Sequence, residues 1–118
     1  MDPGDTYRAV LSERRANIHR DILAALQRVD ANRYATLEEQ VHDTKDQAIS
    51  QLLAQSEDAE MKRSAAELQD IDAALQRVDA GTYGRCTDCG IDIPPARLDA
   101  YSTAKRCLPC QMQYESRR

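Results

Sequence analysis

Apolar residues recur along the first two thirds of the chain with the spacing of helices that each pack on one partner. Between residues 5 and 80 there is neither glycine nor proline, so helix can continue almost throughout. In the second half of this stretch the apolar positions recur at intervals of three, four and seven: Met61, Leu68, Ile71, Leu75 and Val78. In the first half a similar rhythm weakens towards its end: Leu11, Ile18, Ile22, Ala25 and Val29, then Leu37 and Val41. Each half predicts a helix with one narrow apolar stripe.

The two stripes predict a long antiparallel helical hairpin, or coiled coil. A single helix of about 76 residues would be about 110 Å long and would leave its stripe exposed. The expected turn lies at residues 42–46, where the apolar rhythm lapses and Asp and Thr side chains can cap the following helix. Each arm would be about 50 Å long. A parallel dimer of uninterrupted helices is the alternative, and a measurement of molecular size separates the two.

Residues 81–118 have a different pattern, with three of the four glycines and three of the four prolines. Ile91 and Ile93, followed by two prolines, predict a short hairpin, and a helix with Pro109 in its first turn is expected from Leu108 to Arg118. We therefore expect a mostly α protein of two regions, a helical hairpin over residues 1–80 and a small module over residues 81–118. Two stretches of the hairpin, 21–31 and 70–80, share the segment ALQRVDA, from which no function is inferred.

Composition and charge limit the partners. The chain has no Trp or Phe and only five Tyr, which argues against a thick globular core. Residues 1–80 carry ten basic and sixteen acidic side chains, a net −6, and the remainder carries +2. The overall charge of −4 disfavours stand-alone binding to nucleic acid. There is no run of about 18 apolar residues and no signal-peptide core, so we expect a cytoplasmic protein without a membrane partner. The hairpin, in contrast to the parallel dimer, is expected to be a monomer.

Four cysteines form two close pairs, C-x2-C, then seventeen residues, then C-x2-C: Cys86, Cys89, Cys107 and Cys110. Two intervening residues let a tight turn present both thiolates of a pair to one tetrahedral ion, and Gly90 lets the backbone curl towards the sulfurs. Four protein ligands leave no open position, so we expect one structural Zn²⁺. The alternative, a thioredoxin-like redox pair, needs a strand-helix-strand scaffold that the sequence does not predict.

Zinc should also supply stability, because about 38 residues bury too little surface to fold alone. Val78, Tyr83 and Leu98 are expected to pack the helices against this module. No nucleophile and base pair or phosphate-binding loop is present in the sequence, so we do not expect an enzyme.

A specific combination of residues surrounds the cysteines. It comprises G-T-Y-G-R-C-T-D-C-G at residues 81–90, Ile93-Pro94, Arg97-Leu98, Thr103 and C-L-P-C at residues 107–110. In this combination the module resembles the zinc finger of the DksA/TraR family. The family also places a D-x-x-D-x-A motif at the tip of a helical hairpin, and here Asp43, Asp46 and Ala48 fill it at the predicted turn. The resemblance extends from about residue 21 to the C-terminal helix, whereas the additional N-terminal helical region of full-length members is largely absent.

The resemblance implies a transcription regulator that binds RNA polymerase through its secondary channel, without sequence-specific DNA binding. A slim acidic rod can enter a pore that a globular domain cannot. By this interpretation Asp43 and Asp46 act near the catalytic magnesium or mobile basic loops of the polymerase, and Ala48 keeps the tip narrow. The alternative role of the two aspartates is to cap the turn.

The family also receives the alarmone ppGpp in a cleft beside the finger, through several basic residues. Arg63 and Arg97 are possible contacts to ppGpp or to polymerase. Asp70, Tyr101 and Gln111 stand where further basic residues would be expected, and Asp70 would repel the ligand. The sequence therefore predicts a weak or absent ppGpp response.

Two other function classes remain open beside the polymerase regulator. One is a zinc-stabilised adaptor whose helical hairpin binds another protein, and the other is a stand-alone DNA-binding protein. The basic pairs at residues 105–106 and 117–118 are expected to face solvent or polymerase, because they are too few for a nucleic-acid patch.

Overall fold

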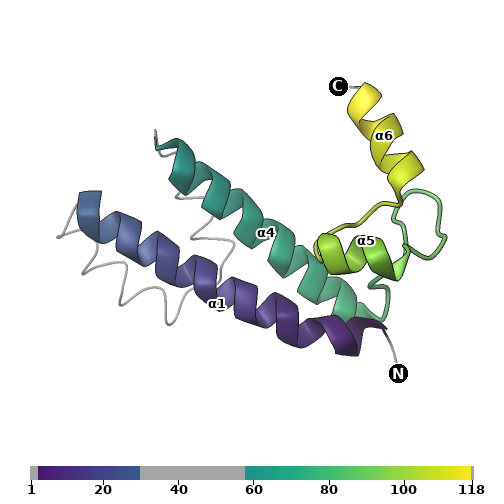
Figure 1. Ribbon diagram of the computed structural model, residues 1–118, viewed down its shortest axis with the longest axis horizontal. Helices are drawn as coiled ribbons and strands as arrows, with labels where there is room; N and C mark the ends of the chain where they lie inside the picture. The colour runs from purple at the N-terminus through teal and green to yellow at the C-terminus, as the bar shows by residue number, and fades with distance from the viewer. Residues whose placement is uncertain (1–2, 30–57, 118) are drawn as a thin grey trace. The chain divides into compact units, whose positions relative to one another are not determined.

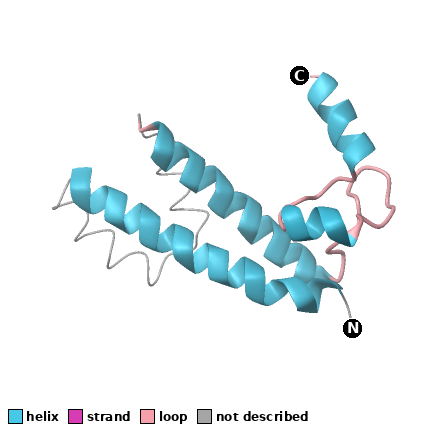
Figure 2. Cartoon of the chain, viewed as in Figure 1, coloured by secondary structure: helices cyan, strands magenta, loops and turns pink. Residues whose placement is uncertain are grey.

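The computed structural model describes residues 3–29 and 58–117, which include four helices (Figures 1 and 2). They are α1 (Pro3–Val29), α4 (Ala59–Ala80), α5 (Pro95–Ala100) and α6 (Leu108–Ser116). The described residues contain no strand, and the mostly α fold class is confirmed. The chain divides into two compact units, residues 1–12 with 73–118 and residues 13–72, and each is described by itself. The predicted turn at residues 42–46 lies outside the described residues.

In the unit of residues 13–72, α1 and α4 lie side by side and run in opposite directions (Figure 1). Among the residues of this unit that the structure describes, the buried apolar side chains are Ile18, Ile22, Met61, Ala65, Leu68 and Ile71. Arg15 Nε lies 3.2 Å from Asp72 Oδ1, and Arg14 pairs with Glu67. Partly exposed ion pairs of this kind stabilise a fold by about 1 kcal/mol at most, so their effect is chiefly on which residues face each other.

The same antiparallel pairing is found in the unit that contains residues 1–12 and 73–118. Arg8 Nη1 lies 2.8 Å from Asp79 Oδ1, one heptad away from the Arg15–Asp72 pair on each helix. Gly4 is buried within α1, and a Cβ there would lie 3.2 Å from Val78 Cγ1. The helix thus begins before residue 5, because Pro3 is tolerated in a first turn and Gly4 permits the close approach.

The apolar stripes are confirmed with one correction. Leu11, Ile18, Ile22, Met61, Leu68, Ile71 and Val78 are buried, whereas Leu75 is only partly so. Ala74 is fully buried instead. Among the described side chains, Ala65 and Ala74 also belong to the seam, the row of buried side chains between α1 and α4, although the hydrophobic spacing did not indicate them. Small side chains at such positions let two helices approach closely. The side chains of Ala25, Val29, Leu37 and Val41 lie outside the described part.

Both ends of α4 are capped by sequence-local hydrogen bonds. Asp58 Oδ1 accepts hydrogen bonds from the backbone N–H groups of Glu60 (2.9 Å) and Met61 (3.2 Å), as an N-cap side chain does in a first helical turn. At the other end Gly81 has φ +77°, and the N–H of Thr82 donates to the Arg77 carbonyl at 2.9 Å. This is a Schellman motif, in which glycine adopts the left-handed conformation at no steric cost.

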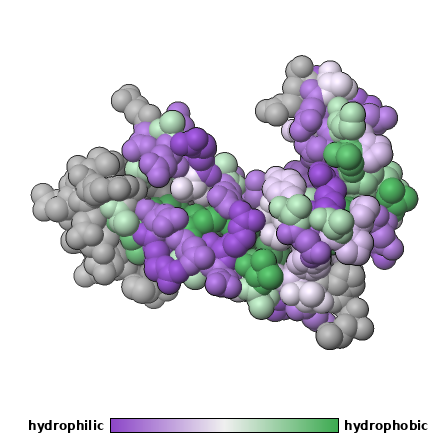
Figure 3. Space-filling model, in the orientation of Figure 1, coloured by the Kyte–Doolittle hydropathy of each residue, from purple (hydrophilic) through white to green (hydrophobic). Residues whose placement is uncertain are grey.

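The module after α4 is built from loops and two short helices. The predicted hairpin is reduced to one antiparallel bridge, Arg85 with Asp92. Helix α5, which was not predicted, follows directly because Pro95 suits the first helical turn, and it buries Leu98. Tyr83 and Leu98 are buried as expected. Helix α6 begins at Leu108 with Pro109 in its first turn, as predicted, and has no buried residue. The face drawn in Figure 3 shows hydrophilic side chains interspersed with smaller apolar patches.

Candidate metal centre

Each cysteine pair is held in a tight turn by backbone hydrogen bonds. In the first pair, the Gly90 N–H donates to the Cys86 carbonyl at 3.0 Å, and Gly90 has φ +81°. The Cys86 N–H donates to the Ile91 carbonyl at 2.8 Å, which closes the turn. The second pair spans the start of α6, where the Gln111 N–H donates to the Cys107 carbonyl at 2.9 Å. One pair therefore lies on a loop and the other at a helix N-terminus.

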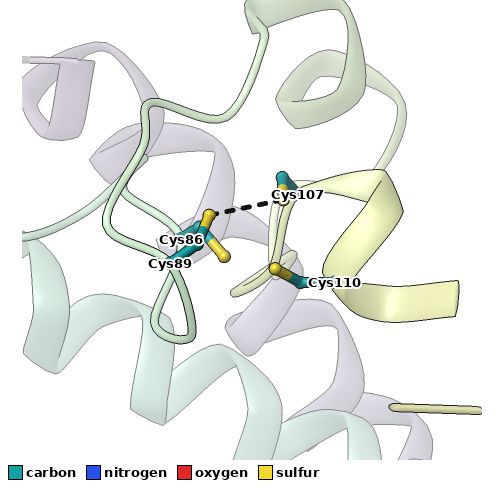
Figure 4. Close-up of side chains that lie close together, drawn as sticks. All are labelled: Cys86, Cys89, Cys107 and Cys110. Carbon is teal, nitrogen blue, oxygen red and sulfur yellow. Dashed lines mark hydrogen bonds between the residues drawn. The ribbon is translucent and has the colours of Figure 1, made fainter. Parts of the chain in front are cut away.

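The two pairs face each other (Figure 4). Their four Sγ atoms all lie within 4.8 Å of one another, and Cys89 Sγ is 3.7 Å from Cys107 Sγ. Tetrahedral bonds of about 2.3 Å between zinc and thiolates place neighbouring sulfurs about 3.8 Å apart. All four cysteines are free of disulfides. The geometry fits one zinc ion held by Cys86, Cys89, Cys107 and Cys110, as the spacing predicted.

The surroundings of the thiols shift the pKa values of Cys86 and Cys110 in opposite directions. Burial opposes ionisation of Cys86, but backbone hydrogen bonds from Cys107, Cys89 and Asp88 outweigh it and lower its pKa to about 6. Hydrogen bonding with the Cys107 side chain, together with burial, raises the pKa of Cys110. The first thiolate thus forms readily and its charge opposes the formation of others. A divalent cation at the centre removes this opposition, so the donor set suits Zn²⁺.

The residues that carry the resemblance serve to build this module. Tyr83 is 4% exposed and its hydroxyl donates to the Ser102 carbonyl at 2.7 Å, which ties the loop before the first pair to the loop before the second. Arg77 Nη2 donates to the Thr103 carbonyl at 3.3 Å, which ties α4 to the same loop. Tyr7 of α1 hydrogen-bonds to Asp99 of α5. The module is therefore attached to the adjoining ends of both long helices.

Arg106 is a residue whose place the sequence prediction missed. It was expected to face solvent or polymerase, but its side chain is 14% exposed and its Nε donates to Asp88 Oδ2 at 2.9 Å. Its guanidinium also lies 3.9 Å from the centre of the Tyr114 ring. No local signal in the sequence links residues 88, 106 and 114, because the contact forms only when the two cysteine pairs come together.

The remaining predicted site residues are not brought into the metal centre. Asp43, Asp46 and Ala48 lie outside the described residues. Arg63 is exposed on α4. Arg97 is partly buried on α5, where its Nε donates to the Arg106 carbonyl at 3.0 Å and its guanidinium lies 5.9 Å from the centre of the Tyr101 ring. Within residues 3–29 and 58–117, no helix has the length and apolar character needed to cross a membrane.

Comparison with known proteins agrees with this geometry. Residues 81–116 match the model of the prokaryotic dksA/traR C4-type zinc finger. The structure is similar to that of transcription factor DksA2 from Pseudomonas aeruginosa, with 25% sequence identity, a TM-score of 0.64, and coverage of 97% of this chain and 84% of that one. A second solved structure is described as the RNA polymerase binding protein and transcriptional regulator Dks from Chlamydia trachomatis. It has 23% identity, a TM-score of 0.42, and coverage of 88% of this chain and 89% of that one.

No curated protein matches the chain. The finger match covers both cysteine pairs, and the structural similarity extends over the long helices as well. The spacing of the cysteines, the clustering of their sulfurs and the match to the family model lead to one conclusion: residues 81–116 of this chain are a C4-type zinc finger of the dksA/traR kind.

Proposed function

We propose that this protein is a DksA-like transcription regulator that binds RNA polymerase through its secondary channel and does not read DNA sequence. The observation that carries the proposal is a DksA/TraR finger that follows two long antiparallel helices, in a fold similar to transcription factor DksA2. We further propose the division into a hairpin, residues 1–80, and a finger region, residues 81–118. The protein acts as a monomer in the cytoplasm, where polymerase lies.

The helices are suited to a narrow channel. With 27 and 22 residues, α1 and α4 have lengths of about 40 Å and 33 Å at 1.5 Å per residue. Residues 1–80 have a net charge of −6. Asp43, Asp46 and Ala48 form the tip in this proposal, so that two carboxylates approach the catalytic magnesium or basic loops of the polymerase.

The contacts of Arg97 support the proposal of a weak or absent ppGpp response. Its Nε is committed to the Arg106 carbonyl, and its guanidinium stacks towards Tyr101. A highly charged anion needs several free basic groups in one place. Asp70, an exposed acid on α4, adds repulsion. The test is binding of labelled ppGpp to the complex of this protein with polymerase. Binding that the Arg63→Ala substitution abolishes would contradict the proposal.

The decisive experiment is a pull-down of purified bacterial RNA polymerase with the zinc-loaded protein, combined with measurement of open-complex lifetime. The wild type should bind and change the lifetime, and Asp43→Ala/Asp46→Ala should lose the change in lifetime. Glu13→Ala/Asp21→Ala is the matched control, because it removes the same number of carboxylates from exposed positions on α1. Equal effects of the two double variants would contradict a specific role of the tip.

Absence of polymerase binding at micromolar concentrations would overturn the proposal and leave the zinc-stabilised adaptor. A DNA-binding function would instead appear as binding to bare duplex that weakens steeply with salt, since phosphate contacts release counterions. Competition with another secondary-channel protein distinguishes channel entry from binding elsewhere on polymerase.

A further inference from the structure

We infer that Arg106 is a positioning residue for the zinc site, which holds the two cysteine pairs in register from outside the metal shell and thereby raises zinc affinity. It contacts no sulfur itself. Its role follows from what its side chain joins, from its burial, and from the charge it places beside four thiolates.

Arg106 joins the two halves of the site. It directly precedes Cys107, and its partner Asp88 lies between Cys86 and Cys89. The 2.9 Å ion pair therefore links one cysteine pair to the other. A backbone hydrogen bond from the Thr87 N–H to the Lys105 carbonyl, 2.9 Å long, runs beside it. Together the two interactions fix the separation of the pairs before a metal binds.

The guanidinium is held on a second side by α6. It lies 3.9 Å from the centre of the Tyr114 ring, within the range of a cation–π interaction. Helix α6 carries Cys110 and has no buried residue, so little apolar packing fixes its direction. The stacking of Arg106 on Tyr114 thus orients the helix that supplies the fourth sulfur.

Charge favours the same arrangement. One Zn²⁺ with four thiolates has a net charge of −2, and the Asp88 carboxylate beside it adds to the repulsion. Arg106 neutralises Asp88 at a position where its own side chain is only 14% exposed, so solvent screens the interaction less than on an open surface. Without Arg106, Asp88 would keep only the long hydrogen bond, 3.4 Å, from the Thr87 hydroxyl and no positive partner. Outer-shell residues of metal sites typically change metal affinity by about 10- to 100-fold.

The experiment measures zinc affinity of the full-length protein by competition with a chromophoric chelator. Arg106→Ala should weaken zinc binding about tenfold, at the lower end of the outer-shell range, and speed chelator-driven zinc release. Arg106→Lys, which keeps the charge but loses the planar group, should give an intermediate value. Lys105→Ala is the matched control, because it removes the neighbouring positive charge and should change the affinity less than twofold.

A double-mutant cycle separates positioning from general destabilisation. If Arg106 acts through Asp88, then Asp88→Ala/Arg106→Ala should bind zinc no more weakly than Arg106→Ala alone. The charge swap Asp88→Arg/Arg106→Asp should recover part of the affinity. Co²⁺ bound to each variant should keep the absorption spectrum of a tetrahedral four-thiolate site. Wild-type zinc affinity in Arg106→Ala, or fully additive losses in the cycle, would overturn the inference.

Discussion

At the scale of single residues, Tyr83 connects a sequence motif with the stability of the module. The ring is buried, its centre lies 5.5 Å from that of Tyr7, and its hydroxyl donates to the Ser102 carbonyl. Burial, followed by the proximity of Tyr7 and Asp99, raises its pKa to about 12. The ionised form is therefore disfavoured in the folded state.

This shift predicts a specific loss of stability in alkali. Because the folded pKa lies above the unfolded value of about 10, the stabilisation is complete below about pH 10 and is lost as pH rises through 12. Between about pH 10 and pH 12 the free energy of unfolding of the wild type should fall by about 2–3 kcal/mol relative to that of Tyr83→Phe, because phenylalanine cannot ionise. Urea unfolding of both proteins along a pH series measures the difference. Parallel pH profiles would show that Tyr83 does not ionise in this way.

At the scale of elements, the seam between α1 and α4 depends on which side chains are fully enclosed. Periodicity predicted both helices, because a stripe at intervals of three, four and seven is a local property of the sequence. It did not distinguish Ala74 from Leu75, which are adjacent on α4. Leu75 is the more hydrophobic of the two, yet Ala74 is the one that is fully buried. Burial at this point follows from the position of α1, and sequence spacing does not define that position.

Two leucine truncations test the corrected seam. Leu68 has no exposed surface, so Leu68→Ala should leave a cavity and lower the free energy of unfolding by about 2–5 kcal/mol. Leu75 is only partly buried, and Leu75→Ala should cost about 1 kcal/mol. Chemical denaturation followed by circular dichroism gives both values. If Leu75→Ala lowered the free energy of unfolding as much as Leu68→Ala does, Leu75 would be a fully packed seam residue and the correction would be wrong.

At the scale of the whole molecule, zinc is expected to stabilise the finger without being the source of most of the helix content. Tyr83, Tyr101 and Tyr114 lie in the finger region, whereas α1 and α4 contain most of the described helical residues. A chelator should therefore abolish most of the near-ultraviolet tyrosine signal while most of the far-ultraviolet helical signal remains.

The stabilisation should also follow mass action. Above the dissociation constant, each tenfold rise in free zinc should add about 1.4 kcal/mol to the stability of the finger. Thermal unfolding at buffered zinc concentrations checks this, and magnesium serves as the control because it does not favour thiolate ligands. An unfolding midpoint that is independent of zinc would contradict a structural role for the metal.

The sequence by itself determined the two long helices, the helix that has Pro109 in its first turn, and the zinc site. Each depends on local features: apolar periodicity, proline and glycine placement, and two C-x2-C turns that can present their sulfurs to only a small region. Gly90 marked a position where the backbone must curl towards the sulfurs, and the structure has φ of +81° there.

Only the tertiary structure decided which residues act across these elements. It placed Gly4 against Val78, enclosed Ala74 in preference to Leu75, added α5, and joined Arg106 to Asp88 and Tyr114. Each of these contacts is between residues that are separated in the chain or depends on how closely two elements approach. Periodicity and spacing describe one element at a time, so they specify which side chains can meet a partner but not which partner they meet.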